Sequence, residues 1–346
     1  MGNTWLEKLE EQLNIDVDWM DPAFSKGLPI VPNDMTSNQL WVDIQMDHPD
    51  NVEMVRTAVQ EYKNEGWLAV YTRVSVLLTR ANIDNIKGRV LLQTLPSEAY
   101  NTDGTLAHGR LYAREFAKVG ISTDRYCLKI PSTGPGLVAA RILESEGVRT
   151  LGTALFGLPQ AIACSQAGCW AISPYYNGRI LTAPLADPAA EHPMSPRLVQ
   201  ILDIYKRLYV QTGKEQPLMK LASFRTAQEV MAAAEFGCHS ATVSKELLEK
   251  LAQMPYNASD AAGQGPPKVA HVYRDSGPLP ARLQNLLLLA PTELLNLDYL
   301  ANNGSQLQLC IAADPLAQER LNDALDLFKG AEARSRVKIE ALMARA

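Results

Sequence analysis

The sequence lacks the residue patterns that are typical of metal-binding, disulfide-linked and membrane-spanning proteins. Its five cysteines are an odd number, and no two of them form a Cys-X-X-Cys pair, which argues against structural disulfides and fits a reducing compartment. Its five histidines are scattered along the chain with no metal-ligand spacing, so we expect no metal site. No apolar run is long enough to cross a bilayer, and we therefore expect no membrane partner.

The sequence also has no excess of positive charge. Its formal net charge of −5 at pH 7 excludes nucleic-acid binding driven by bulk charge, although a local basic pocket for a phosphate stays open. The first residues lead into the charged segment Glu7–Glu11, which does not resemble a signal peptide. We therefore expect a cytoplasmic protein without a nucleic-acid partner.

Short apolar segments alternate with helical patterns about eight times between residues 15 and 254. Such alternation implies parallel strands that are joined by right-handed crossovers. Eight units within about 240 residues predict an α/β fold of the closed (β/α)8 barrel type, with additional helices near the C-terminus. An open doubly wound sheet is the alternative, but it would usually carry a glycine-rich phosphate loop after the first strand, and this sequence has none.

We expect the chain to form a single domain. The barrel core would cover about 15–254, a loop or insertion rich in glycine and proline would follow at about 255–282, and helices would occupy about 283–346. The second unit of the barrel is the least regular in its sequence. Its apolar stretch at 28–32 contains two prolines, which suit a strand only at its start or at an irregular position.

The apolar segment Tyr126–Pro131 contains a lysine, Lys129, and runs into a Pro-Ser-Thr turn. A lysine inside an apolar strand is unfavourable unless it is paired or used. Its side chain could extend to solvent from the end of the strand. Alternatively, burial could lower the pKa of its amine, which would then attack a carbonyl carbon and form a Schiff base. The spacing alone does not distinguish these two interpretations.

Polar side chains collect at the expected carboxyl ends of the strands, where (β/α)8 barrels carry their active sites. They comprise one acid, one lysine, neutral hydrogen-bonding groups and two arginines, namely Asp18, Asn38, Gln93, Lys129, Thr153, Ser173, Ser223, Arg179 and Arg225. Each residue alone has a structural explanation, such as a turn, a helix cap or a surface arginine, so the joint placement carries the argument. Two arginines can hold a phosphate, and their field favours a neutral lysine. The set predicts a site for a carbonyl substrate that bears a phosphate.

Four motifs resemble the signatures of transaldolases. Leu128–Thr133 resembles their Lys-Ile-Pro-(Ala/Ser)-Thr signature, and Met35–Leu40 resembles their Thr-Thr-Asn-Pro-Ser-Leu signature. Ile172–Ile180 resembles their Ile-Ser-Pro-Phe-Val-Gly-Arg-Ile segment with one extra residue, and Ala222–Arg225 matches their Ala-Ser-Phe-Arg. The order and rough spacing hold from about 15 to 255, and the resemblance implies a (β/α)8 barrel. We expect no cofactor, and a homodimer, since members of the family often form dimers.

The resemblance implies the exchange of a dihydroxyacetone unit between sugar phosphates, as in the pentose phosphate pathway. Lys129 would form a Schiff base with a ketose phosphate, and cleavage of the C3–C4 bond would leave an enamine that an aldose phosphate takes up. Asp18 would act as acid and base on the cleaved hydroxyl. Asn38 and Ser173 would hold the hydroxyls of dihydroxyacetone, and Thr153 would help to hold the catalytic water. The phosphate would be bound by Arg179, Arg225 and Ser223.

Several positions depart from the transaldolase pattern. Gln93 stands where the family has a glutamate on the third strand, and Tyr175 stands where it has a phenylalanine. Glu98 would supply the missing acid only if the register of this strand differs from the expected one. A glutamine positions water but takes no proton, and Gln93, Thr153 and Tyr175 resemble the water-holding set of fructose-6-phosphate aldolases. Two alternatives to transfer are therefore open. One is direct aldol cleavage, as by a fructose-6-phosphate aldolase or an aldolase of specialised metabolism, and the other is a barrel that has lost catalysis and only binds sugar phosphates.

Overall fold

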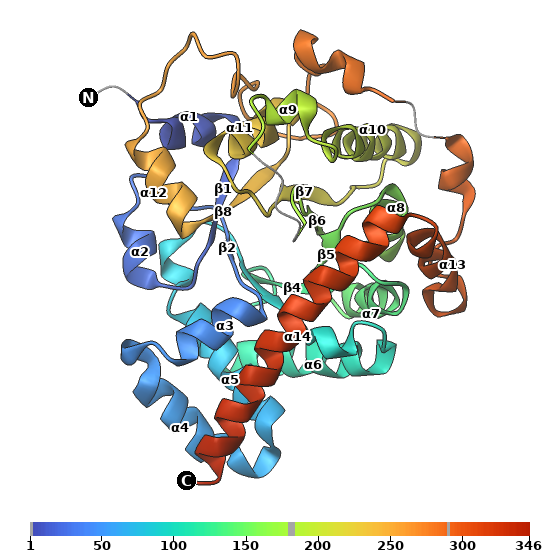
Figure 1. Cartoon of the computed structure of the whole chain (residues 1–346). Helices are drawn as coiled ribbons and strands as arrows, with labels where there is room; N and C mark the ends of the chain where they lie inside the picture. The colour runs from blue at the N-terminus through green and yellow to red at the C-terminus, as the bar shows by residue number, and fades with distance from the viewer. Residues whose placement is uncertain (1–2, 179–183, 289–290) are drawn as a thin grey trace.

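The computed structural model describes residues 3–178, 184–288 and 291–346. Within these ranges, eight parallel strands pair in chain order, and the first also pairs with the last, which closes the sheet into a barrel. The strands are β1 Asn14–Asp18, β2 Met35–Thr36, β3 Val90–Gln93, β4 Tyr126–Pro131, β5 Thr150–Leu155, β6 Ala171–Pro174, β7 Leu218–Leu221 and β8 Ser240–Ser244. The predicted (β/α)8 barrel is confirmed, and the open sheet is excluded (Figure 1).

Helices connect the strands and surround the barrel (Figure 1). The α-helices are α1 Trp5–Gln12, α2 Pro22–Gly27, α3 Gln39–Met46, α4 Val52–Tyr62, α5 Trp67–Arg80, α6 Thr102–Lys118, α7 Gly134–Ser145, α8 Leu158–Ala167, α9 Pro188–Glu191, α10 Ser195–Thr212, α11 Ala227–Phe236, α12 Lys245–Gln253, α13 Ala301–Ala312 and α14 Pro315–Met343. All of residues 256–280 are described, and they carry no helix or strand. None of the described helices combines the length and apolarity that a membrane span requires.

The second unit of the barrel lies further along the chain than its apolar pattern suggested. Residues 28–32 form no strand, and β2 instead pairs Met35 and Thr36 with the start of β3. The two prolines explain the difference, because proline has no N–H to donate to a neighbouring strand. Asn38 follows β2 closely and caps α3, since its Oδ1 accepts a hydrogen bond from the Leu40 amide at 2.9 Å.

Side chains that point into the barrel form two layers. The apolar part of the lower layer is a small cluster of its own, built from Leu91, Cys127, Leu151 and Ala171. Side chains alternate between the two faces of a strand, so the residue two positions later points inward as well. The upper layer, at the carboxyl ends of the strands, therefore contains Gln93, Lys129, Thr153 and Ser173. Asp18 follows Asp16 on β1 in the same way.

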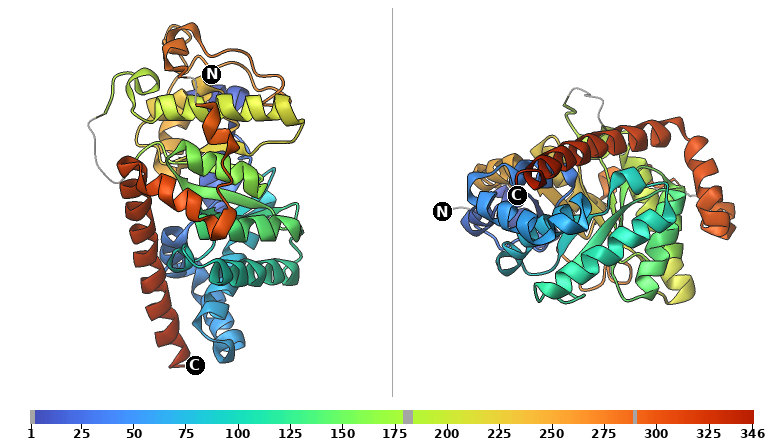
Figure 2. Two further views of the ribbon diagram at one scale, coloured as in Figure 1. Left: turned by 90° about the vertical axis from the view of Figure 1, so that its right-hand side faces the viewer. Right: turned by 90° about the horizontal axis from the view of Figure 1, so that it is seen from below.

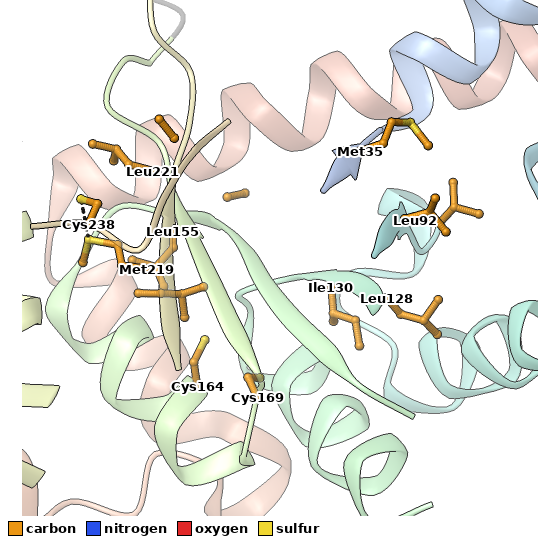
Figure 3. Packing of buried hydrophobic residues seen from close by; sticks show 14 of the residues in the cluster. Met35, Leu92, Leu128, Ile130, Leu155, Cys164, Cys169, Met219, Leu221 and Cys238 are labelled. Atoms are coloured by element: carbon orange, nitrogen blue, oxygen red, sulfur yellow. Dashed lines mark hydrogen bonds between the residues drawn. The ribbon is translucent and has the colours of Figure 1, made fainter. Parts of the chain in front are cut away.

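The outward faces of the strands pack against the helices and form the large hydrophobic core (Figure 3). Leu128 and Ile130 flank Lys129 in the sequence, and both are buried in this outer core. Because neighbours on a strand point to opposite faces, the lysine between them must point into the barrel. The apolar residues of β4 thus fix the direction of its one charged side chain.

A buried ion cluster occupies the lower layer beside the small apolar cluster. The Lys220 Nζ lies 2.9 Å from Asp16 Oδ2 and 2.7 Å from Asp34 Oδ2, and it donates to Ser240 Oγ at 3.0 Å. The three charged side chains are at most 1% exposed. Removal of the lysine would leave two buried carboxylates without their cation, which is strongly unfavourable.

We predict that Lys220→Met lowers the free energy of unfolding by about 3–5 kcal/mol, measured by urea denaturation at pH 7. The matched control is Lys87→Met, which removes a half-exposed lysine that pairs with Glu10 at 2.8 Å. The control is expected to change the free energy by less than about 1 kcal/mol. A loss from Lys220→Met no larger than that of the control would show that the cluster does not hold the lower layer together.

The C-terminal helix α14 lies across the carboxyl end of the barrel and packs against α3, α5 and β5 (Figures 1 and 2). At its start, Asp314 accepts hydrogen bonds from Arg197 of α10 at 2.5 and 3.2 Å. Near its end, Arg334 and Lys338 donate to the buried Asp43 of α3 at 2.7 and 2.8 Å. Because these contacts anchor α14 at both ends, we propose that the whole chain forms one domain.

Candidate active site

A cavity of about 250 Å³ lies at the carboxyl end of the barrel, between the strand ends and α14. Five of the predicted site residues line it, namely Asp18, Asn38, Lys129, Tyr175 and Ser223. Helix α14 supplies the opposite wall with Arg320, Asp323, Ala324, Leu327 and Phe328. A larger cavity of about 380 Å³ lies at the amino end of the barrel, and none of the predicted site residues lines it.

Lys129 is a buried amine in the upper layer and is 4% exposed. Its Nζ donates hydrogen bonds to Thr36 Oγ1 and to the Ser37 carbonyl oxygen, both at 3.0 Å. Burial lowers the pKa of Lys129, and the negative charge of Asp18 offsets only part of this effect. A lowered pKa enlarges the fraction of neutral amine, which is the nucleophilic form. The interpretation of Lys129 as a lysine that extends to solvent from the end of its strand is therefore wrong.

Asp18 ends β1 and faces the same cavity as the lysine. Its Oδ1 accepts a hydrogen bond from the Trp41 Nε1 at 2.8 Å. Burial raises the pKa of Asp18, while the charge of Lys129 and the hydrogen bond from Trp41 oppose the rise. A carboxyl group with a raised pKa can take and return a proton closer to neutral pH than an exposed aspartate can.

The residues expected to hold water lie on both sides of Lys129, on β3, on β5 and directly after β6. Gln93 on β3 is in register with Lys129, and its side-chain Oε1 and Nε2 are buried without a hydrogen bond to any described residue. On the other side, Thr153 Oγ1 lies 3.0 Å from Tyr175 Oη. Burial raises the pKa of Tyr175, so its hydroxyl remains protonated and can donate. Polar groups without charge therefore flank the lysine on both sides.

Glu98 does not replace Gln93 in the site. It ends a short 3-10 helix, Pro96–Glu98, that follows β3, and its Oε2 accepts a hydrogen bond from Asn101 Nδ2 at 2.7 Å. The described residues that line the cavity do not include it. The alternative register of the third strand is therefore wrong, and the glutamine is the residue that faces Lys129.

Two strand ends at the site have an irregular backbone. Ala154, directly after Thr153, has φ of 51°, and the register between β5 and β6 shifts at this position. Ser223, just beyond β7, has φ of 66°, and its Oγ donates to the Asn177 carbonyl at 3.0 Å. Non-glycine residues in this left-handed region are strained by roughly 1–3 kcal/mol each and cluster at functional sites.

Ser173 is buried on β6 in register with Thr153.

Of the two arginines predicted to bind phosphate, the structure describes only Arg225. Arg179 lies outside the described residues. Arg225 follows β7, and its Nη2 donates to the Gly178 carbonyl at 2.6 Å. Helix α14 brings a further arginine, Arg320, into the wall of the cavity. Strand-end reasoning missed it, since the amphipathic pattern of α14 predicts a packed helix but not the surface on which it packs.

We predict that Asp18→Asn lowers the pKa of Lys129 further, because the charge of Asp18 is what partly restores it. The pKa would be measured as the pH midpoint of reductive methylation at Lys129 with formaldehyde, followed by peptide mass spectrometry. The half-exposed Lys87 provides an internal reference whose midpoint should stay constant. An unchanged or higher midpoint at Lys129 would contradict electrostatic coupling between the two groups.

Comparison with known proteins identifies the relatives of this chain. The family model described as "Transaldolase/Fructose-6-phosphate aldolase" matches residues 15–335, which includes much of α14. A protein named transaldolase from Xanthomonas euvesicatoria is 29% identical, over 86% of this chain and 85% of its own length. Transaldolases from a Synechocystis and a Nostoc species are 31% and 33% identical over 72% of this chain, and over 65% and 77% of their own lengths.

Proposed function

This chain belongs to the transaldolase/fructose-6-phosphate aldolase family, a family of enzymes, and we propose that it transfers a dihydroxyacetone unit between sugar phosphates through a Schiff base on Lys129. The observation that carries the proposal is the buried amine of Lys129, whose pKa is lowered and whose cavity also contains Asp18. The relatives named transaldolase support the reaction class. The nucleophile, the acid and base, and the substrate are our proposal.

The proposed reaction starts with the neutral Nζ of Lys129, which attacks the C2 ketone of a ketose phosphate. Loss of water leaves an iminium ion. Asp18 removes the proton from the C4 hydroxyl, the C3–C4 bond breaks, and its electron pair moves toward the iminium nitrogen. An aldose phosphate leaves, and an enamine of dihydroxyacetone remains on the lysine. The enamine then attacks an acceptor aldehyde, Asp18 returns the proton, and water releases the product from the lysine.

The substrate would extend from Lys129 toward the ends of β6 and β7. The Oδ1 of Asn38 serves as the cap of α3, so its Nδ2 is the group that would donate to a dihydroxyacetone hydroxyl. Ser173 would assist from β6. The phosphate would lie near Ser223 and Arg225, with Arg179 as a third contact that the family motif implies. Phosphate recognition by arginine is favoured because the guanidinium donates two parallel hydrogen bonds.

We predict that Lys129→Met abolishes exchange between fructose 6-phosphate and an aldose phosphate, because no other amine lines the described cavity. The fold should persist, since methionine fills similar space and removes a buried polar group. Circular dichroism and the Tm would check the fold, and Lys87→Met is the control that keeps full activity. Retained exchange in Lys129→Met would show that the lysine assignment is wrong.

A second candidate function is direct aldol cleavage, in which water protonates the enamine to an iminium ion and a further water hydrolyses this ion, so that dihydroxyacetone is released and the amine of Lys129 is restored. The hydroxyl pair of Thr153 and Tyr175 and the amide of Gln93 favour it, because these groups could hold that water beside the lysine. In transfer, the same water would compete with the acceptor aldehyde. The two reactions therefore share Lys129 and Asp18 and differ in what reacts with the enamine.

We predict that Gln93→Glu raises the ratio of transfer to cleavage several-fold, because an ionised carboxylate only accepts hydrogen bonds and so removes the amide N–H that could donate to the water beside Lys129. The ratio would be measured with fructose 6-phosphate, with and without an acceptor aldose phosphate. Gln166→Glu adds the same charge on the exposed side of α8 and should leave the ratio unchanged. An unchanged ratio in Gln93→Glu would count against the water-holding role.

A further inference from the structure

Two arginines converge on the backbone at Gly178, on the rim of the cavity that contains Lys129. From one side, the Arg225 Nη2 donates to the Gly178 carbonyl at 2.6 Å. From α14, Arg320 lies so close that a Cβ at residue 178 would be 2.9 Å from its Cγ and 3.1 Å from its Nε. A glycine at this position is what allows the approach. The two guanidinium groups therefore lie beside the same peptide although they are 95 residues apart in the chain.

Arg320 has hydrogen-bonding capacity that the described residues do not use. Its Nη1 is buried and makes no hydrogen bond to any of them. The neighbouring Arg197, by contrast, donates to the Phe156 carbonyl at 3.1 Å and to both carboxylate oxygens of Asp314. A buried guanidinium N–H without an acceptor is unfavourable, and an anion in the cavity would supply one.

Both arginines and carboxylates lie near Arg320. Burial and the positive charges of Arg197 and Arg225 lower the pKa of Arg320, and the carboxylates of Glu319 and Asp314 only partly oppose this. Asp314 is already paired with Arg197. The cavity also contains Asp323, one turn further along α14. An anion would therefore bind at the Gly178 end of the cavity, where the guanidinium groups lie, and away from Asp323.

We propose that Arg320 of the C-terminal helix binds the phosphate of the substrate together with Arg225. This inference rests on the proposed function, and it adds a residue that lies far from the barrel strands in the sequence. Helix α14 is anchored by Asp314 at its start and by Arg334 near its end, so it presents Arg320 from a rigid element. The consequence is a preference for substrates that carry a terminal phosphate.

The test compares Arg320→Met with Arg336→Met, which removes a half-exposed arginine from the same helix. With fructose 6-phosphate, Arg320→Met should raise KM about 10–100-fold and change kcat by less than about 3-fold, as for a lost contact to a charged group. Arg336→Met should match the unmodified protein. Arg320→Lys should give an intermediate KM, because it restores the charge without the two-pronged geometry. An unchanged KM in Arg320→Met would overturn the inference.

Two further measurements separate a phosphate contact from other causes. With unphosphorylated dihydroxyacetone as the donor, Arg320→Met should have the same KM as the unmodified protein. An equal rise in KM for both donors would indicate a displaced helix and would contradict the inference. Calorimetric titration with inorganic phosphate needs no turnover, and its Kd should rise about tenfold in Arg320→Met. Equal Kd values would contradict the role of Arg320, whereas a protein that binds phosphate but converts neither donor would contradict the proposed function alone.

Discussion

The desolvation of one amine is the constraint on which the site depends. Leu128 and Ile130 face the outer core, and this turns Lys129 into a closed barrel where a full positive charge is poorly solvated. The hydroxyl of Thr36 and the carbonyl of Ser37 accept its hydrogen bonds without adding charge. Asp18 supplies the opposing charge, yet its own pKa is raised by the same burial. The pKa of the amine is thus lowered and the pKa of the acid is raised, so both move toward neutral pH, which suits the proton transfer in the proposed reaction.

The cavity exists because the chain returns to the barrel after its last strand. Helix α14 closes the carboxyl end and is held by ion pairs at both of its ends, with Arg197 near its start and with Asp43 near its end. The strands supply Lys129 and Asp18, whereas the helix supplies part of the wall and a guanidinium near Gly178. In the proposed function, catalysis and substrate recognition are divided between the barrel and the helix that follows it.

The alternation of side chains between the two faces of a strand explains how much of the candidate site could be predicted from the sequence. Once Tyr126–Pro131 is recognised as a strand, the direction of Lys129 follows from its apolar neighbours, and the same rule places Gln93 and Thr153 beside it. The position of β2 was predicted poorly because prolines interrupt the apolar stretch before it. Arg320 could not be found, because local pattern shows that a helix buries one face but does not show what it covers. Which residues a side chain of a distant segment comes to lie beside is decided by tertiary packing alone.

The most direct test of the central claim is reduction of the protein with borohydride in the presence of fructose 6-phosphate, followed by peptide mass spectrometry. We expect one stable adduct per chain, located on the peptide that contains Tyr126–Pro131 and absent when the ketose phosphate is omitted. The fully buried Lys220 in the lower layer should remain unmodified. An adduct on a different lysine, or no adduct while the sugar phosphate is being converted, would contradict Schiff-base formation at Lys129.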